Sequence, residues 1–411
     1  MSFPKYDPYQ ALRYPEYRLF ISSRLFLTLG IQMQTVIVGW QVYKITNDPF
    51  SLGLIGLAEF LPAISVSLFA GHAADVVPRK QIIIPSLALL SLCSIALLSY
   101  SLNEDFLLQH GAVPIYIIIF LSGFARGFIG PALFSFMPQL IERKAYSNAI
   151  TWNSSTWQMA AVAGPAIGGI AYGFLGVELS YLIDLIFILL SLFLMLMVKS
   201  KPLPESSESN SMLDRIKTGI RFVFNNQIIL SAISLDLFAV LFGGAVALLP
   251  VFAKDILHAG PEALGLLRAA PAIGSVLMAV GMAYRPIKKK AGVKLLLSVT
   301  GFGISIILFA LSKEVWLSFI LLLFSGVFDS VSVIIRSTLV HTLTPENMKG
   351  RVSAVNNIFI GSSNELGSFE SGLAAKLLGV VPSVIFGGCM TLLVVGITAK
   401  KARQLRELNL E

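Results

Sequence analysis

The stretch "IIIFLSGFARGFIGPALF", residues 117–134, carries one arginine, Arg126, inside a run of apolar and small residues. A run of this length and composition is typical of a membrane-spanning helix. A charge at the bilayer centre costs about 2.5–3.5 kcal/mol on insertion scales, and such residues face a polar cavity or pair with another charge. The stretch therefore predicts both a membrane helix and a polar interior around Arg126.

The composition of the whole chain is that of a membrane protein. Of its 411 residues, 55% are hydrophobic and 13% are charged, and the mean hydropathy is +0.78. Soluble domains carry about 25% charged residues. The net charge of +8 does not indicate a nucleic-acid partner, because Lys and Arg collect in the cytoplasmic loops of membrane proteins. A soluble or disordered protein is therefore excluded.

Twelve stretches are long and apolar enough to span a membrane. A spanning helix needs about 20 mainly apolar residues. The expected spans are 18–43, 50–74, 81–101, 112–138, 148–174, 179–198, 227–253, 262–284, 293–311, 314–342, 350–376 and 380–399. Backbone polar groups in lipid must bond internally, so each span is predicted to be an α-helix and the fold class to be all-α.

The distribution of basic residues predicts that both termini are cytoplasmic. With that orientation, the outer loops hold only four of the 31 Lys and Arg residues, namely Lys44, Lys254, Lys313 and Lys376. Cytoplasmic loops of membrane proteins are enriched in these residues, and the asymmetry sets the orientation.

The longest polar stretch divides six spans from six. Residues 199–226 join a Pro/Ser/Glu-rich linker to an amphipathic segment, which we expect to lie on the cytoplasmic face of the membrane. The predicted domains are an N-terminal six-helix bundle (1–198), this cytoplasmic linker (199–226) and a C-terminal six-helix bundle (227–411).

The two halves repeat at an offset of 203 residues. "GIAYGFLGV" (169–177) aligns with "GLAAKLLGV" (372–380), and "SGFAR" (122–126) aligns with "SGVFD" (325–329). Repeats related by an axis along the membrane normal place substrate sites at their interface. Arg126 and Asp329 are therefore equivalent positions of opposite charge. We predict that they form a charge pair, direct or bridged, in a central cavity; the alternative is a static ion pair that only joins the halves.

Further ionisable and polar side chains lie within the expected spans. A carboxylate that gains and loses an arginine partner between two states can carry a proton. The expected proton-coupling residues, in order of preference where one exists, are Asp329, Asp236, Glu59 and Glu365. The expected cavity residues are Arg126, Arg268, Arg336, Gln32 and Trp40, with Trp152 among further aromatic candidates. Asp184 falls near the outer end of a span and is assigned no role.

Two further motifs lie in the first half of the chain. The loop after the second span reads "GHAADVVPRK" (71–80), in which Gly71, Asp75, Arg79 and Lys80 form a glycine, an aspartate and a basic pair at fixed spacing. Ordinary capping and positive loop charge are the alternative interpretation of this spacing.

The second motif lies in the fifth span, which reads "AVAGPAIGGIAYG" (161–173). Its small and helix-bending residues are Gly164, Pro165, Gly168 and Gly169. The GxxxG spacing permits close helix packing, and the proline adds a local bend. Generic packing of small residues is the alternative to a specific functional element.

Both motifs resemble elements of the major facilitator superfamily. The loop resembles its signature loop, departing from it at Val76 and Pro78, and implies that Asp75 braces a cytoplasmic gate. The second motif resembles the GPxxGG element of the fifth helix, which is characteristic of exporters working as antiporters. Three stretches, "GWQVYKIT", "GLLRAAPAIGS" and "GRVSAVNNIFIGSSNELGSFESG", are similar to the bacterial group of enterobactin and drug exporters.

This resemblance implies a secondary transporter of two six-helix bundles in the bacterial cytoplasmic (inner) membrane. It implies export of a siderophore, drug or metabolite by alternating access and proton antiport, with cavity-lining spans one, four, seven and ten. The expected partners are protons, membrane lipid and the small-molecule substrate, and we expect a monomer. An importer, or a transporter of a different solute or lipid on the same fold, is the alternative.

The sequence gives little support to catalysis or to a bound cofactor. The chain has no GxxxxGKS or GxxxxGKT loop for nucleotide phosphates, so ATP is not expected to drive transport directly. Its four histidines fall in separate segments and form no metal-ligand motif. We therefore expect no enzyme activity, no cofactor and no metal site.

Overall fold

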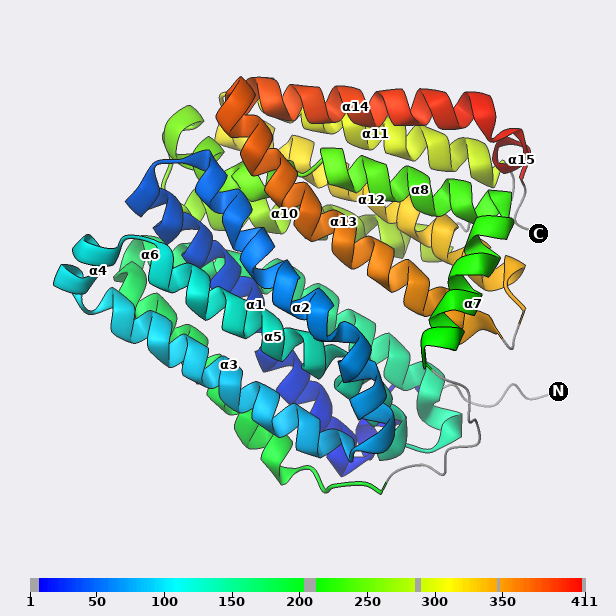
Figure 1. The fold of residues 1–411 in the computed structure, drawn as a ribbon, viewed down its shortest axis with the longest axis horizontal. Helices are drawn as coiled ribbons and strands as arrows, with labels where there is room; N and C mark the ends of the chain where they lie inside the picture. Colours follow the sequence, from blue (N-terminus) through cyan, green and yellow to red (C-terminus); the bar gives the residue numbers. More distant parts are fainter. Residues whose placement is uncertain (1–6, 203–211, 285–289, 346–347, 409–411) are drawn as a thin grey trace. The chain divides into compact units, whose positions relative to one another are not determined.

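The structure, a computed structural model, describes residues 7–202, 212–284, 290–345 and 348–408 (Figure 1). Every secondary-structure element within these ranges is helical. The all-α fold class expected from the apolar runs is thereby confirmed.

The helices pack into two compact units. The first unit comprises Met1–Val38 and Ala58–Ser207, and the second unit comprises Gly39–Leu57 and Glu208–Glu411. The elements that begin in the first unit are η1 (Ala11–Arg13), α1 (Pro15–Thr46), α3 (Arg79–Ser101), α4 (Glu104–His110), α5 (Val113–Phe136), η2 (Met137–Leu140), η3 (Arg143–Ala145) and α6 (Tyr146–Met197), with most of α2 (Pro49–Val76). The end of α1 and the start of α2 belong to the second unit.

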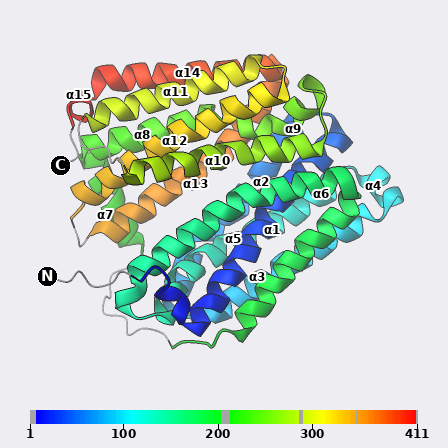
Figure 2. The same ribbon diagram turned by 180° about the vertical axis from the view of Figure 1, so that it is seen from behind.

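The remaining elements all lie in the second unit. They are α7 (Met212–Asn225), α8 (Gln227–Phe242), η4 (Ala245–Leu248), α9 (Leu249–Val251), η5 (Phe252–Ile256), α10 (Pro261–Tyr284), α11 (Ala291–Leu311), α12 (Val315–Leu343), α13 (Lys349–Leu378), α14 (Val380–Lys401) and α15 (Arg403–Arg406). Within this unit α11 lies beside α14, and α10 lies beside α12 (Figure 2). The predicted amphipathic segment lies in α7, and residues 203–211 of the predicted linker lie outside the described residues.

Ten helical runs of the described chain are long and apolar enough to cross a membrane. The expected spans 148–174 and 179–198 fall together in one run, Arg143–Met197, which is interrupted at Gly176 by a backbone with φ 85° and ψ 175°. The expected span 350–376 forms α13, which is too polar to be among the ten. The chain is thus a multi-pass membrane protein, while twelve spans and cytoplasmic termini remain predictions.

Local sequence explains where several helices begin. Proline is the first residue of α1, α2 and α10, where its fixed φ suits a helix and its missing N–H costs no hydrogen bond. Asn226 precedes α8, and its side chain accepts a hydrogen bond of 3.1 Å from the Ile229 N–H. These signals set helix ends but carry no information on which helices become neighbours.

Glycines allow α6 to approach α1 closely in the first unit. A Cβ atom added at Gly164 would lie 2.6 Å from the Gln32 Cβ, and one at Gly168 would lie 2.9 Å from the Met33 carbonyl oxygen. Pro165 and Gly169 are buried on the same helix. The glycine face of the GPxxGG element is therefore a helix-packing surface, and its link to antiport remains a prediction.

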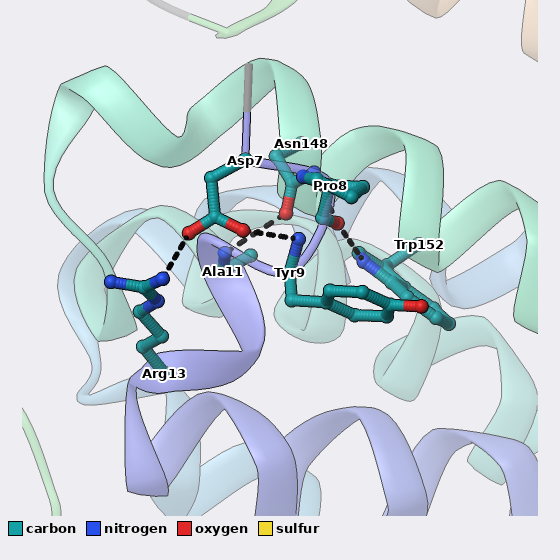
Figure 3. Close-up of polar contacts among 7 residues, drawn as sticks. All are labelled: Asp7, Pro8, Tyr9, Ala11, Arg13, Asn148 and Trp152. Atoms are coloured by element: carbon teal, nitrogen blue, oxygen red, sulfur yellow. Dashed lines mark hydrogen bonds and ion pairs between the residues drawn. The ribbon is translucent and has the colours of Figure 1, made fainter. Parts of the chain in front are cut away.

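The segment before α1 folds back onto the start of α6 (Figure 3). The Asn148 side chain accepts a hydrogen bond from the Ala11 N–H at 2.9 Å and donates one to the Pro8 carbonyl at 2.8 Å. The Trp152 indole donates to the same carbonyl at 2.9 Å, and its ring lies 6.1 Å from that of Tyr9. We call residues 7–13 the N-terminal strap. Trp152 was expected to line a cavity, but its indole N–H binds this strap.

Asn148→Ala is expected to lower the free energy of unfolding by about 1–3 kcal/mol, the cost of an unsatisfied buried hydrogen-bonding group. Ala11 is fully buried, so water cannot replace the lost acceptor. Trp152→Phe is the comparison variant, because it keeps a ring beside Tyr9 and removes only one of the two donors to the Pro8 carbonyl. Thermal melting in detergent measures both variants, and an Asn148→Ala protein as stable as Trp152→Phe would contradict this role.

Candidate functional site

A buried ion pair lies in the second unit between α8 and α12. Arg336 Nη1 contacts Asp236 Oδ2, and the two residues are 3% and 6% exposed. Within the described residues, Arg336 Nε has no hydrogen-bond partner. Charges buried this deeply need mutual compensation, because removing an ion from water costs several kcal/mol. The predicted proton-coupling residue Asp236 is therefore held by the predicted cavity residue Arg336.

Asp329 lies two helical turns before Arg336 on α12 and lines two cavities. The smaller cavity, of about 10 Å³, also meets Asp236 and Ser332, and its size suits a single water molecule. The larger, of about 310 Å³, also meets Arg268 and Glu365. No ion pair to Asp329 is formed by any residue that the structure describes. Four predicted site residues of the second unit, Asp236, Asp329, Arg268 and Glu365, thus line two cavities that share Asp329.

The first unit contains a separate polar network centred on Arg126. Arg126 Nη1 pairs with Glu59 Oε1 of α2, and its Nη2 donates to Gln34 Oε1 of α1 at 3.3 Å. Arg126 is only half-buried, and so is Glu59. The structure therefore gives Arg126 a partner, Glu59, that the sequence interpretation did not pair with it, and the Arg126–Asp329 pair remains a prediction.

This network continues to a carboxylate that the sequence analysis left without a role. Asp184 is 0% exposed. Its Oδ2 accepts hydrogen bonds from Ser94 Oγ at 2.8 Å and from Gln34 Nε2 at 3.2 Å. The placement near a helix end was misleading because the helix break falls at Gly176, which leaves Asp184 two turns inside the second half of α6. The spacing of Ser180, Asp184 and Ser191, all fully buried, was the available signal of a polar face toward the core.

The repeat extends to the charges of both units. "EFLPAI" (59–64) of α2 aligns with "RAAPAI" (268–273) of α10 at an offset of 209 residues, six more than for Arg126 and Asp329, so Glu59 corresponds to Arg268. The packing is repeated too: a Cβ at Gly123 would clash with the Glu59 carbonyl, and one at Gly326 would clash with the Pro271 carbonyl. In the first unit the cation Arg126 on α5 pairs with the anion Glu59 on α2. In the second unit the corresponding positions have the opposite charges, with an anion on α12 and a cation on α10.

Trp40 lies with the tip of the α1–α2 hairpin, Gly39–Leu57, which packs within the second unit. Trp40 is 9% exposed. Close by in sequence, Tyr43 donates to Asp255, and Lys254 Nζ donates to Asn47 Oδ1 at 2.6 Å. This set of contacts anchors the hairpin tip to the segment after α9.

The residues of the signature-like loop are only partly described. Arg79 is buried, and Lys80 Nζ donates to the Leu196 carbonyl at 2.8 Å, which satisfies a free carbonyl at the end of α6. Gly71 lies within α2, and the side chain of Asp75 lies outside the described residues. The gating role of these residues remains a prediction.

Comparison with known proteins gives a family model described as transmembrane secretion effector, which matches residues 6–410. The enterobactin exporter of Salmonella typhimurium is 24% identical over 395 residues, covering 93% of each chain. The enterobactin exporter of Citrobacter koseri is 24% identical over 376 residues, covering 91% of this chain and 89% of that protein.

Solved structures share the fold at low sequence identity. A bacterial homologue of the human lysosomal transporter Spinster aligns with a TM-score of 0.73 and 14% identity over 95% of this chain and 98% of its own. The POT family transporter PepTSo aligns with a TM-score of 0.73 and 11% identity over 99% of this chain and 100% of its own. At these identities the likeness concerns the fold alone.

Proposed function

Because this chain belongs to the transmembrane secretion effector family of the major facilitator superfamily, and is a transport protein rather than an enzyme, we propose that it exports a small molecule in exchange for protons. We place it in the bacterial inner membrane, with twelve spans in two pseudo-symmetric six-helix bundles and cytoplasmic termini. The charge asymmetry of the loops and the repeat at 203 residues support this arrangement.

The observation that carries the coupling proposal is the position of Asp329. Asp329 lines both the larger cavity and the small cavity, and the small cavity is also lined by Asp236 of the Asp236–Arg336 pair. A carboxylate at a cavity wall can exchange a proton with solvent or substrate. We therefore assign Asp329 as the principal proton carrier, with Asp236, Glu59 and Glu365 as further candidates.

The larger cavity suits an oxygen-rich, partly aromatic ligand. Arg268 supplies a guanidinium that can bind anionic oxygens, Asn364 and Ser368 supply polar groups, and Phe302 supplies an aromatic wall. The similarity to enterobactin exporters points to the same chemistry. We propose a siderophore-type chelator as the substrate class, with a drug-like amphiphile or another metabolite as the competing choice.

Asp329→Asn is expected to abolish transport driven by a pH gradient in proteoliposomes while leaving substrate exchange without a gradient intact. An asparagine keeps the shape of the side chain but cannot take up a proton. Glu314→Gln is the matched control, because Glu314 immediately precedes the same helix and is exposed. Normal gradient-driven transport by Asp329→Asn would remove the residue from the coupling mechanism.

Substrate class and direction are tested with the wild-type protein. A ligand that binds only the folded state stabilises it by about 2.7 kcal/mol at a concentration of 100 Kd. We expect catecholate-type chelators to raise the melting temperature and lipophilic cations to leave it unchanged. Stabilisation by cations alone would favour a drug exporter, and accumulation in right-side-out rather than inside-out vesicles would favour an importer.

A further inference from the structure

Asp184 is the most deeply buried carboxylate that the proposed coupling mechanism does not use. It is 0% exposed and lies on α6, facing Ser94 of α3 and Gln34 of α1. Its Oδ2 accepts the two hydrogen bonds from these side chains, while its Oδ1 has no hydrogen-bond partner within the described residues. A Cβ at Gly30 of α1 would lie 3.2 Å from this Oδ1, so the carboxyl group is enclosed on that side as well.

The charges around Asp184 do not balance if every group is ionised. The network holds two carboxylates, Glu59 and Asp184, and one guanidinium, Arg126, whose direct ion pair is with Glu59. Within the described residues, the hydrogen-bond partners of Asp184 are a neutral hydroxyl and a neutral amide, and Arg126 acts on it from beyond Gln34. An isolated buried carboxylate costs many kcal/mol, whereas a neutral carboxyl group costs no more than other buried polar groups. One added proton makes the network neutral.

The orientation of the Gln34 amide links the two carboxylates. Arginine can only donate, so the Gln34 oxygen must face Arg126 and the Gln34 nitrogen must face Asp184 Oδ2. This orientation also disfavours a metal cation at Asp184. Hard cations take about six oxygen ligands, and the amide directs a donor rather than an oxygen toward the site.

In the described part of the chain, the further titratable groups that interact with Asp184 or Arg126, directly or through Tyr181, are neutral side chains at pH 7. They are the phenols of Tyr181 and Tyr172 on α6 and the thiol of Cys93 on α3. The ordinary pKa values of these side-chain types lie above 7, so they add no charge there. The protonation of Asp184 is therefore decided by Arg126 and Glu59.

We propose that Asp184 is a second proton-binding site, which holds its proton while Arg126 pairs with Glu59. Because one guanidinium serves two carboxylates, the first unit retains one proton shared between Glu59 and Asp184. When Glu59 takes up that proton, Arg126 turns its charge toward Gln34 and compensates an ionised Asp184. The site concerns proton binding alone and does not depend on the substrate or direction given under the proposed function.

Infrared spectra of the full-length protein in detergent at pH 7, without substrate, test this site when the spectra of variants are subtracted from one another. We expect the Asp329→Asn protein, which lacks the principal proton carrier, to show a carboxylic-acid C=O band that is lost when Asp184→Asn is added. When Glu59→Gln is added instead, the freed guanidinium should ionise Asp184, so the same band should also disappear. Transport is not measured, so failure of the exporter proposal would leave these spectra unaffected.

The melting temperatures of Asp184 variants give a second test of whether the Asp184 carboxyl group is neutral. Asparagine matches a neutral carboxyl group in shape, so Asp184→Asn should melt close to the wild type, whereas Asp184→Leu removes both hydrogen bonds and should melt lower. If that band persists after Asp184→Asn is added to Asp329→Asn, or if sodium chloride removes it from Asp329→Asn, the proposal is overturned; the latter outcome would identify a sodium site.

Discussion

Replacing Arg336 with methionine is expected to destabilise the second unit by about 3–5 kcal/mol, the cost of leaving one buried charge without its partner. Asp236 would remain 6% exposed with no other cation in ion-pair contact among the described residues. We expect little folded protein from this variant, and a strongly lowered melting temperature for whatever is purified.

The test of this ion pair is rescue by a second substitution. Arg336→Met combined with Asp236→Leu removes both charges, and replacing a buried pair by apolar side chains is often neutral or stabilising. We expect the double variant to recover most of the lost stability while transport stays impaired. If each single change and the double change lower the melting temperature additively, the two side chains do not depend on each other.

Gly326→Ala is expected to cost about 3 kcal/mol, the upper part of the usual range for an overpacked core. A Cβ at this position would overlap the Pro271 carbonyl of α10, which is backbone and cannot rotate away. The neighbouring Gly274 of α10 makes the reciprocal approach to the Leu323 carbonyl of α12. A methyl group therefore forces two helices apart along the wall of the cavity that Asp329 lines.

Gly281→Ala is the matched control for that experiment. Gly281 also lies on α10, but a Cβ there meets no atom within 4 Å. Alanine in an open helical position is favoured over glycine by about 0.5–1 kcal/mol. Thermal melting should therefore separate the two variants in opposite directions, and equal melting temperatures would mean that α10 and α12 are not in close contact at Gly326.

The sequence did not predict which intramembrane charges form ion pairs. The repeat identified Arg126 and Asp329 as equivalent positions, which predicted a pair between the halves. Within the first unit, however, Arg126 binds Glu59, which is 67 residues away on α2. The second repeat, Glu59 with Arg268, is visible in the sequence, but its meaning depends on the contact of α2 with α5.

Composition, apolar run length, loop charge and small-residue motifs determined the fold class, the membrane location and the family, because each depends on local chemistry. Bilayer thickness sets helix length, and the GxxxG spacing marks a packing face without reference to its partner. Which helix meets that face, and which carboxylate meets which arginine, depends on the rotation and depth of each helix. Only tertiary packing decides these, and so it alone paired Asp236 with Arg336 and Glu59 with Arg126, and buried Asp184 against Ser94 and Gln34.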